Sequence, residues 1–183
     1  MTPSDVYEER YGPDPKTILV IAVCFLFTAA ALLVPLDALT RILTLALFGV
    51  GGVVMLVGTF SRKVALRVDG NGITLGGSPL RYAATTVHVP WAEVEAVVLW
   101  RQQLAQNLPY LGVLRPHDAP PLHGTPTSPA GKLMAGFGYA VSGAPDLRLI
   151  ATARAVNGWR LDLDRLTAAV RHHAPGVAVR DLR

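Results

Sequence analysis

The chain has a single cysteine, Cys24, among its 183 residues, so one chain forms no internal disulfide. The sequence also lacks a Cys-x-x-Cys pair, a His-Glu-x-x-His motif and a Gly-x-Ser-x-Gly elbow. The stretch 124–133 ends in Gly-Lys-Leu, whereas a P-loop needs Ser or Thr after its lysine. These absences exclude the familiar motifs of zinc sites, serine hydrolases and P-loop nucleotidases.

Carboxylates and histidines are present, but they do not form a catalytic pattern. Glu93 and Glu95 share one face of a predicted strand, and the sequence places no second acid or base beside them. We interpret that face as solvated. His172 and His173 are adjacent on a predicted helix, where neighbouring side chains point about 100° apart and do not converge on one ion. We therefore predict a protein that is not an enzyme, with no metal and no cofactor.

Charge is missing from two long apolar runs, 17–36 and 42–60, which contain no acid or base. Each is close to the ~20 residues with which an α-helix crosses a hydrocarbon core. Only 37–41 separates them, so the pair predicts an antiparallel transmembrane hairpin. A cleaved signal peptide would have a shorter apolar region and a small-residue cleavage site. A buried helical pair of a soluble protein would keep a polar stripe, and neither run has one.

The bases near the ends of the runs predict the orientation of the hairpin. Lys16 precedes the first run, and Arg62 and Lys63 follow the second, whereas the short loop has only Arg41. Because bases gather on the cytoplasmic side, we expect both termini in the cytoplasm. Fourteen arginines against three lysines are typical of a genome rich in G and C. The expected location is therefore the inner membrane of a bacterial cell, with a multi-pass topology.

Outside the runs, we expect a disordered tail over 1–16 and a β-rich domain over 61–183. Hydrophobic residues alternate over 64–68 and 73–75, around the turn Asp69-Gly70-Asn71-Gly72, which predicts a β-hairpin. The alternation predicts further strands over 86–89, 94–101, 110–114, 137–141 and 147–155. Five prolines in 116–131 indicate a mobile surface loop. Spacings of three and four predict a helix from about Asp162 to Ala174, ended by Pro175-Gly176.

About seven antiparallel strands followed by one amphipathic helix resemble the pleckstrin-homology-like (PH-like) fold. The resemblance is carried by 66–75 (LRVDGNGITL), by 89–97 (VPWAEVEAV) and by Trp159-Arg160-Leu161-Asp162 before the last helix. It is closest to bacterial, actinobacterial-type PH-like proteins that have membrane spans before the domain. The resemblance implies an α+β domain built as a barrel and capped by the C-terminal helix. Its motifs imply packing and turn positions, and no chemistry.

The main functional expectation is a non-catalytic interaction module that presents a protein-binding surface at the cytoplasmic face. One alternative is a sensor of anionic lipid surfaces, with Arg62, Lys63 and Arg67 as the headgroup contacts. Another is an accessory subunit of a larger membrane complex. The small residues of the second run, Gly49 and Gly52, favour packing inside the hairpin, and oligomerisation of the chain is the alternative. Nucleic-acid binding is not expected, because the bases are scattered without interleaved aromatics.

Overall fold

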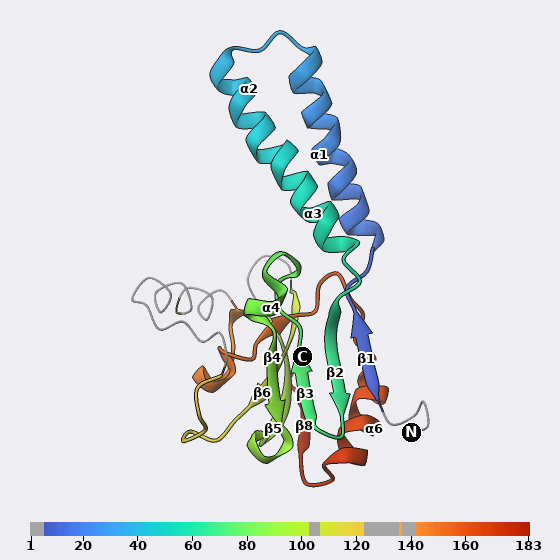
Figure 1. Cartoon of the computed structure of the whole chain (residues 1–183), viewed down its shortest axis with the longest axis vertical. Helices are drawn as coiled ribbons and strands as arrows, with labels where there is room; N and C mark the ends of the chain where they lie inside the picture. The colour runs from blue at the N-terminus through green and yellow to red at the C-terminus, as the bar shows by residue number, and fades with distance from the viewer. Residues whose placement is uncertain (1–5, 103–106, 123–135, 137–141) are drawn as a thin grey trace.

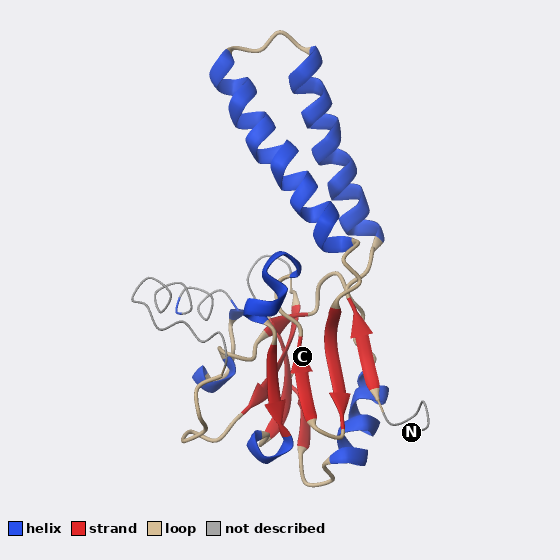
Figure 2. Cartoon of the chain, in the orientation of Figure 1, coloured by secondary structure: helices blue, strands red, loops and turns tan. Residues whose placement is uncertain are grey.

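The structure is a computed structural model that describes residues 6–102, 107–122, 136 and 142–183. A helical hairpin stands on one end of a β-rich domain, and the long axis of the molecule runs through both (Figure 1). The end of the domain next to the helices is called the hairpin-proximal end below. Apart from short turns, the only helix that packs on the described part of the domain is α6 (Figure 2).

The hairpin consists of α1 and of one continuous helix, Ala38–Thr59, formed by α2, η1 and α3. Asp14 caps α1 by accepting hydrogen bonds from the backbone N–H groups of Lys16 and Thr17, and Asp37 caps α2 by accepting one from Thr40. The helices thus begin before the apolar runs, at their acidic caps. Their bounds are α1 Pro15–Leu33, α2 Ala38–Thr44, the π-helical η1 Leu45–Val50 and α3 Gly51–Thr59.

Both helices are long and apolar enough to cross a membrane, with 19 and 22 residues. At ~1.5 Å per residue, they match a hydrocarbon core of ~30 Å. Their side chains are mostly exposed, as Leu33 at 84% and Leu26 at 68% illustrate. This burial pattern differs from that of a helix pair inside a soluble core, whose apolar side chains would be covered.

Small residues of the second helix face the first one. A Cβ atom on Gly52 would lie 3.1 Å from the Cβ of Cys24, and one on Gly49 would lie 3.7 Å from Thr28. Beside them, the rings of Phe27 and Phe48 stack with centroids 4.7 Å apart. Gly49 and Gly52 therefore serve the close approach of the two helices, as the sequence favours.

The domain contains two four-stranded sheets. Sheet A has the order β1-β2-β3-β4, and sheet B has the order β7-β6-β5-β8. The strands of sheet A are β1 Tyr7–Arg10, β2 Val64–Asp69, β3 Gly72–Leu75 and β4 Val87–Pro90. Those of sheet B are β5 Ala96–Arg101, β6 Pro109–Leu114, β7 Arg154–Ala155 and β8 Ala178–Asp181. The expectation of an α+β domain is confirmed, but the described strands form two open sheets in place of one closed barrel.

One prediction about the N-terminal segment is wrong, because Tyr7–Arg10 is a strand and not a disordered tail. β1 pairs antiparallel with β2, with Tyr7 opposite Val68 and Arg10 opposite Val64. Tyr7 is only 2% exposed, and its hydroxyl accepts a hydrogen bond from the backbone N–H of Asp162 at 3.1 Å. The helical hairpin is therefore inserted between two neighbouring strands of sheet A.

The core lies between the inner faces of the two sheets and α6 Leu163–His173. It is made of aliphatic side chains that the alternation of the strands turns inward, and Leu166 and Val170 of α6 are fully buried against them. Asp162 caps α6 as expected, by accepting a hydrogen bond from the backbone N–H of Arg165. The outer face of sheet B is also covered, because Trp100 packs there against Leu149 and Ala144.

Most of the other strand predictions are confirmed, and one is wrong. The predicted strands near 64–68, 73–75, 86–89, 94–101 and 110–114 are observed within two residues at each end. The prediction over 147–155 is wrong: η4 Leu147–Leu149 is a 3-10 turn, and only Arg154–Ala155 pairs. β8 was not predicted, and it pairs parallel to β5. The strand expected over 137–141 and most of the loop 116–131 lie outside the described residues.

Candidate functional site

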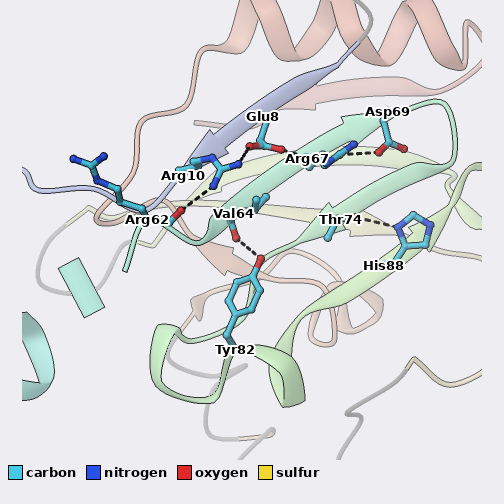
Figure 3. A network of polar contacts seen from close by, with 9 residues as sticks. All are labelled: Glu8, Arg10, Arg62, Val64, Arg67, Asp69, Thr74, Tyr82 and His88. Carbon is cyan, nitrogen blue, oxygen red and sulfur yellow. Dashed lines mark hydrogen bonds and ion pairs between the residues drawn. The ribbon is translucent and has the colours of Figure 1, made fainter. Parts of the chain in front are cut away.

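The outer face of sheet A carries a row of polar side chains that pair across the strands (Figure 3). Arg67 on β2 lies between two acids: its Nη1 is 3.4 Å from Glu8 and its Nε is 2.9 Å from Asp69. Further along the face, the hydroxyl of Thr74 and Nδ1 of His88 are 3.0 Å apart. Alternation along each strand brings these residues to the face opposite the core. The result is an ordered, charge-paired surface.

The acid at the turn of this face is held ionised. Burial raises the pKa of Asp69, but a hydrogen bond from the backbone N–H of Asn71 and the guanidinium of Arg67 hold that pKa below its ordinary value. Trp91 covers the turn by donating its Nε1–H to the carbonyl of Asp69 at 2.8 Å. The polar face of sheet A therefore keeps a fixed negative charge beside Arg67 at neutral pH.

The hairpin-proximal end of the domain carries a different set of charges. Exposed bases surround the two points where the chain enters and leaves the helices, and we call them the basic collar: Arg10, Lys16, Arg62, Lys63 and Arg81. Arg10 also pairs with Glu8, at 2.6 Å. The one acid at the entry to α1, Asp14, caps that helix. Among the described residues, this end therefore has an excess of positive charge.

The three bases predicted as headgroup contacts lie on different parts of the domain. Arg62 and Lys63 lie at the hairpin-proximal end, and the side chain of Arg62 points away from the network on sheet A (Figure 3). Arg67 is three residues further along β2 than Val64, roughly 10 Å from the start of the strand, and it is paired with Glu8 and Asp69. Lipid contact by Arg62 and Lys63 stays a prediction, and Arg67 belongs to the polar face of sheet A.

A loop, 76–86, connects β3 to β4 at the hairpin-proximal end. It contains the 3-10 turn η2 Pro79–Arg81 and the short helix α4 Tyr82–Thr85. Pro79 lies under the end of α3, since a Cβ atom on Gly58 would be 3.9 Å from it. Lys63 donates to the carbonyl of Pro79 at 2.8 Å, and its ammonium lies 5.2 Å from the ring centroid of Tyr82.

Arg154 of β7 holds both ends of this loop. Its Nε donates to the carbonyl of Gly76 at 2.9 Å, and its Nη2 donates to that of Thr85 at 2.8 Å. Burial lowers the pKa of Arg154. Burial also raises the pKa of the neighbouring Tyr11, although the charge of Arg154 opposes that shift. The guanidinium thus fixes the backbone at both ends of the loop.

Glu93 and Glu95 differ from their predicted arrangement. Glu93 lies in the 3-10 turn η3 Trp91–Glu93 and forms an ion pair with the buried Arg115. Glu95 pairs with Arg148, whose Nη1 is 3.0 Å away. Glu95 is exposed, but the prediction that the two carboxylates share a strand face is wrong, because Glu93 lies in η3 and β5 begins only at Ala96. Both partners lie more than 20 positions away in sequence, so local spacing does not reveal them.

A cavity of about 170 Å³ lies between the hairpin and the domain, lined by Tyr11, Thr17, Met55, Gly58, Pro79 and Gly158 among others. Pockets for drug-sized ligands are roughly 300–1,000 Å³. In the part of the chain that the structure describes, no three His, Cys, Asp or Glu side chains gather as a metal site. The rings of His172 and His173 are 4.9 Å apart and edge to face.

Sequence reasoning missed Arg81, Leu80 and Arg154 as residues of the hairpin-proximal end. Arg81 and Leu80 reach it because β2 leaves the hairpin and β3 returns to it, a pairing that the Asp69-Gly70-Asn71-Gly72 turn does predict. Following that turn to the end of β3 identifies both residues from sequence. No local signal places Arg154 at this loop, because the loop carbonyls that it binds are 69 and 78 positions away.

Comparison of the chain with protein-family models, with curated proteins and with solved structures finds no match.

Proposed function

We propose that this chain is a membrane-anchored, non-catalytic binding module. The helical hairpin crosses the inner membrane of a bacterial cell, both termini face the cytoplasm, and a PH-like domain presents the outer face of sheet A to a protein partner. The observation that carries the proposal is the direct attachment of two exposed apolar helices to β1 and β2.

The attachment limits how far the domain can move from the membrane. Residues 11–14 join β1 to α1, and residues 60–63 join α3 to β2. Backbone hydrogen bonds brace both connections, from Tyr11 to Lys63 at 2.9 Å and from Gly12 to Gly158 at 2.7 Å. Sheet A therefore projects from the bilayer with its polar face accessible from the side.

The polar face supports binding of a protein better than binding of a small molecule. The pairing of Glu8, Arg67 and Asp69 across neighbouring strands orders these side chains before a partner arrives. Pre-ordered side chains lower the entropy cost of association, and complementary charges give specificity. A partner with a matching pattern of charges is the ligand that this surface fits.

Site-specific photo-crosslinking tests the proposal on the full chain in its native membrane. A photoreactive residue replaces Thr74 or His88 on the polar face, and Arg171 on the exposed side of α6 serves as the matched control. We expect one discrete adduct at Thr74 and His88 that Asp69→Lys abolishes, and none at Arg171. Equal crosslinking at all three positions, or none at the face, contradicts the proposal.

The second candidate function is recognition of an anionic lipid surface, and the basic collar favours it. Lipid-reading clusters usually contain ~4–8 bases beside a membrane span. The collar reaches that size with residues from four separate segments, whereas the three bases predicted from sequence do not. Its test is part of the experiment in the next subsection.

A further inference from the structure

The loop 76–86 combines an exposed apolar side chain with bases at the hairpin-proximal end. Leu80 is 55% exposed on η2, directly before Arg81, which is also exposed. Phe60, the residue that ends α3, is 56% exposed. In the rest of the described domain, the other strongly exposed large apolar side chains are Leu147 and Leu182. Of the three leucines, Leu80 is the one that lies beside the end of the hairpin.

The position of Leu80 follows from the packing of Pro79. Pro79 lies 3.9 Å from the Cβ position of Gly58 on the last turn of α3. Leu80 is the next residue, so it lies at the level where α3 leaves the apolar layer. Figure 1 shows α4 and the turn before it rising above the strands toward the helices.

The loop is held rigidly from three directions. The hydroxyl of Tyr82 donates to the carbonyl of Val64 at 2.9 Å, which ties the loop to the first residue of β2 (Figure 3). Lys63 and Arg154 bind its backbone at Pro79, Gly76 and Thr85. Gly76 and Gly77 have no room for a Cβ atom, which would lie 2.0 Å from the carbonyl oxygen of Val64 and 2.1 Å from Oγ1 of Thr85.

Rigid placement matters because an apolar side chain that is already ordered loses little entropy on entering a bilayer. Apolar residues flanked by bases are typical of segments that lie in the interface of anionic membranes. Lys63 and Arg81 supply these bases on either side of Leu80.

We propose that the loop 76–86 is a second membrane-docking element, in which Leu80 enters the headgroup layer and Arg81 and Lys63 contact the phosphates of anionic lipids. The proposal rests on the membrane crossing of the hairpin described above. The docking fixes the tilt of the domain, so the polar face of sheet A points in one direction relative to the bilayer. The occupant is the lipid surface itself, with phosphatidylglycerol as the probe.

Fluorescence of an environment-sensitive label tests the docking in the full chain. In a Cys24→Ala background, a nitrobenzoxadiazole label is attached at Leu80→Cys, Leu147→Cys or Leu26→Cys, and each chain is reconstituted into vesicles. The vesicles contain phosphatidylcholine alone or a mixture of phosphatidylcholine with the anionic phosphatidylglycerol. Spin-labelled lipids with the quencher at shallow or deep positions report the depth of each label.

We expect the label at position 80 to be quenched by the shallow quencher, and more strongly in anionic vesicles. Arg81→Gln should lower that association by about fivefold, the effect of one base near an anionic surface. The label at position 147, on an equally exposed leucine far from the hairpin, should stay solvent-like in every vesicle. A label at position 80 that behaves like the one at 147 overturns the docking proposal.

The label at position 26 separates this outcome from failure of the membrane anchor. Quenching there by the deep quencher in both kinds of vesicle supports the crossing of the hairpin. If the label at 26 is quenched and the label at 80 is not, only the docking loop is wrong. If the label at 26 is not quenched, the proposed anchor itself is wrong.

Discussion

At the scale of single residues, two glycines of one turn have opposite requirements. Gly72 has φ +147°, and a Cβ atom there would lie 2.2 Å from the carbonyl oxygen of Val89. Gly70, two positions earlier, has nothing within 4 Å of its Cβ position. The turn sequence predicts the β-hairpin, but it does not show which glycine is essential, because the obstructing carbonyl belongs to β4.

Gly72→Ala should therefore destabilise the domain by about 3 kcal/mol, since both backbone strain and the clash oppose the side chain. Gly70→Ala should change the free energy of unfolding by no more than about 0.5 kcal/mol. Denaturant unfolding of the full chain in detergent micelles, followed by the fluorescence of its three tryptophans, measures both. Similar stability of the two variants would contradict this assignment.

Arg62 has a left-handed backbone conformation that its sequence context does not predict. It has φ 50°, which costs a non-glycine residue about 1–2 kcal/mol. Its carbonyl accepts a hydrogen bond from Nη1 of Arg10 at 3.2 Å. The strained residue therefore ties the segment that follows α3 to β1. The sequence identifies Arg62 as a base near a membrane, while its backbone role depends on β1, which the sequence does not reveal.

At the scale of elements, the clearest signals in the sequence were local ones. The turn of the β2–β3 hairpin and the Asp162 cap of α6 each lie within a few residues of the element that they define. β1 and β8 were not predicted, because each pairs with a strand that is distant in sequence and no turn signal joins the two. β1 is also polar in sequence, so its partner β2, more than 50 positions away, decides its structure.

A domain that lacks β1 should not fold as the native one does. In one chain, a Gly-Ser linker replaces residues 15–60 and joins Asp14 to Ser61. In a second chain, residues 1–14 are also removed. We expect the first to unfold cooperatively as a monomer. The second should aggregate, because it loses the buried Tyr7 and exposes the edge of β2.

Light scattering and thermal melting of the two chains measure this difference. Tyr7→Phe in the first chain is the control, since it keeps the ring in the core and removes the hydrogen bond from Asp162 at a cost of about 1 kcal/mol. A second chain as stable and as monomeric as the first would show that β1 is dispensable.

At the scale of the whole molecule, the protein divides into an apolar helical hairpin and a domain whose adjoining end carries the basic collar. The exposed leucines of α1 and the continuous helix end where Lys16, Arg62 and Lys63 begin. The sequence predicted this division well, because hydropathy is a local property. The sequence did not predict that Arg81 belongs to the basic collar, because Arg81 reaches the hairpin-proximal end only after β3 has run back toward the helices.

The proposed topology predicts which residues a membrane-impermeant maleimide reaches. In a Cys24→Ala background, Ala38→Cys at the tip of the hairpin should react in intact cells. Asn71→Cys, at the far end of sheet A, should react only after the inner membrane is made permeable. The reverse pattern would contradict the orientation, and labelling of both positions in intact cells would contradict the crossing.

The insertion of the hairpin between β1 and β2 also sets an order of events during synthesis. β1 leaves the ribosome first, but it has no partner until residues 64–69 have been made, after both apolar helices. The two strands meet only if the helices return the chain to the side from which it entered. In the proposed membrane topology, sheet A is therefore completed only in a chain whose two helices have both crossed the bilayer, because a single crossing would leave β1 and β2 on opposite sides.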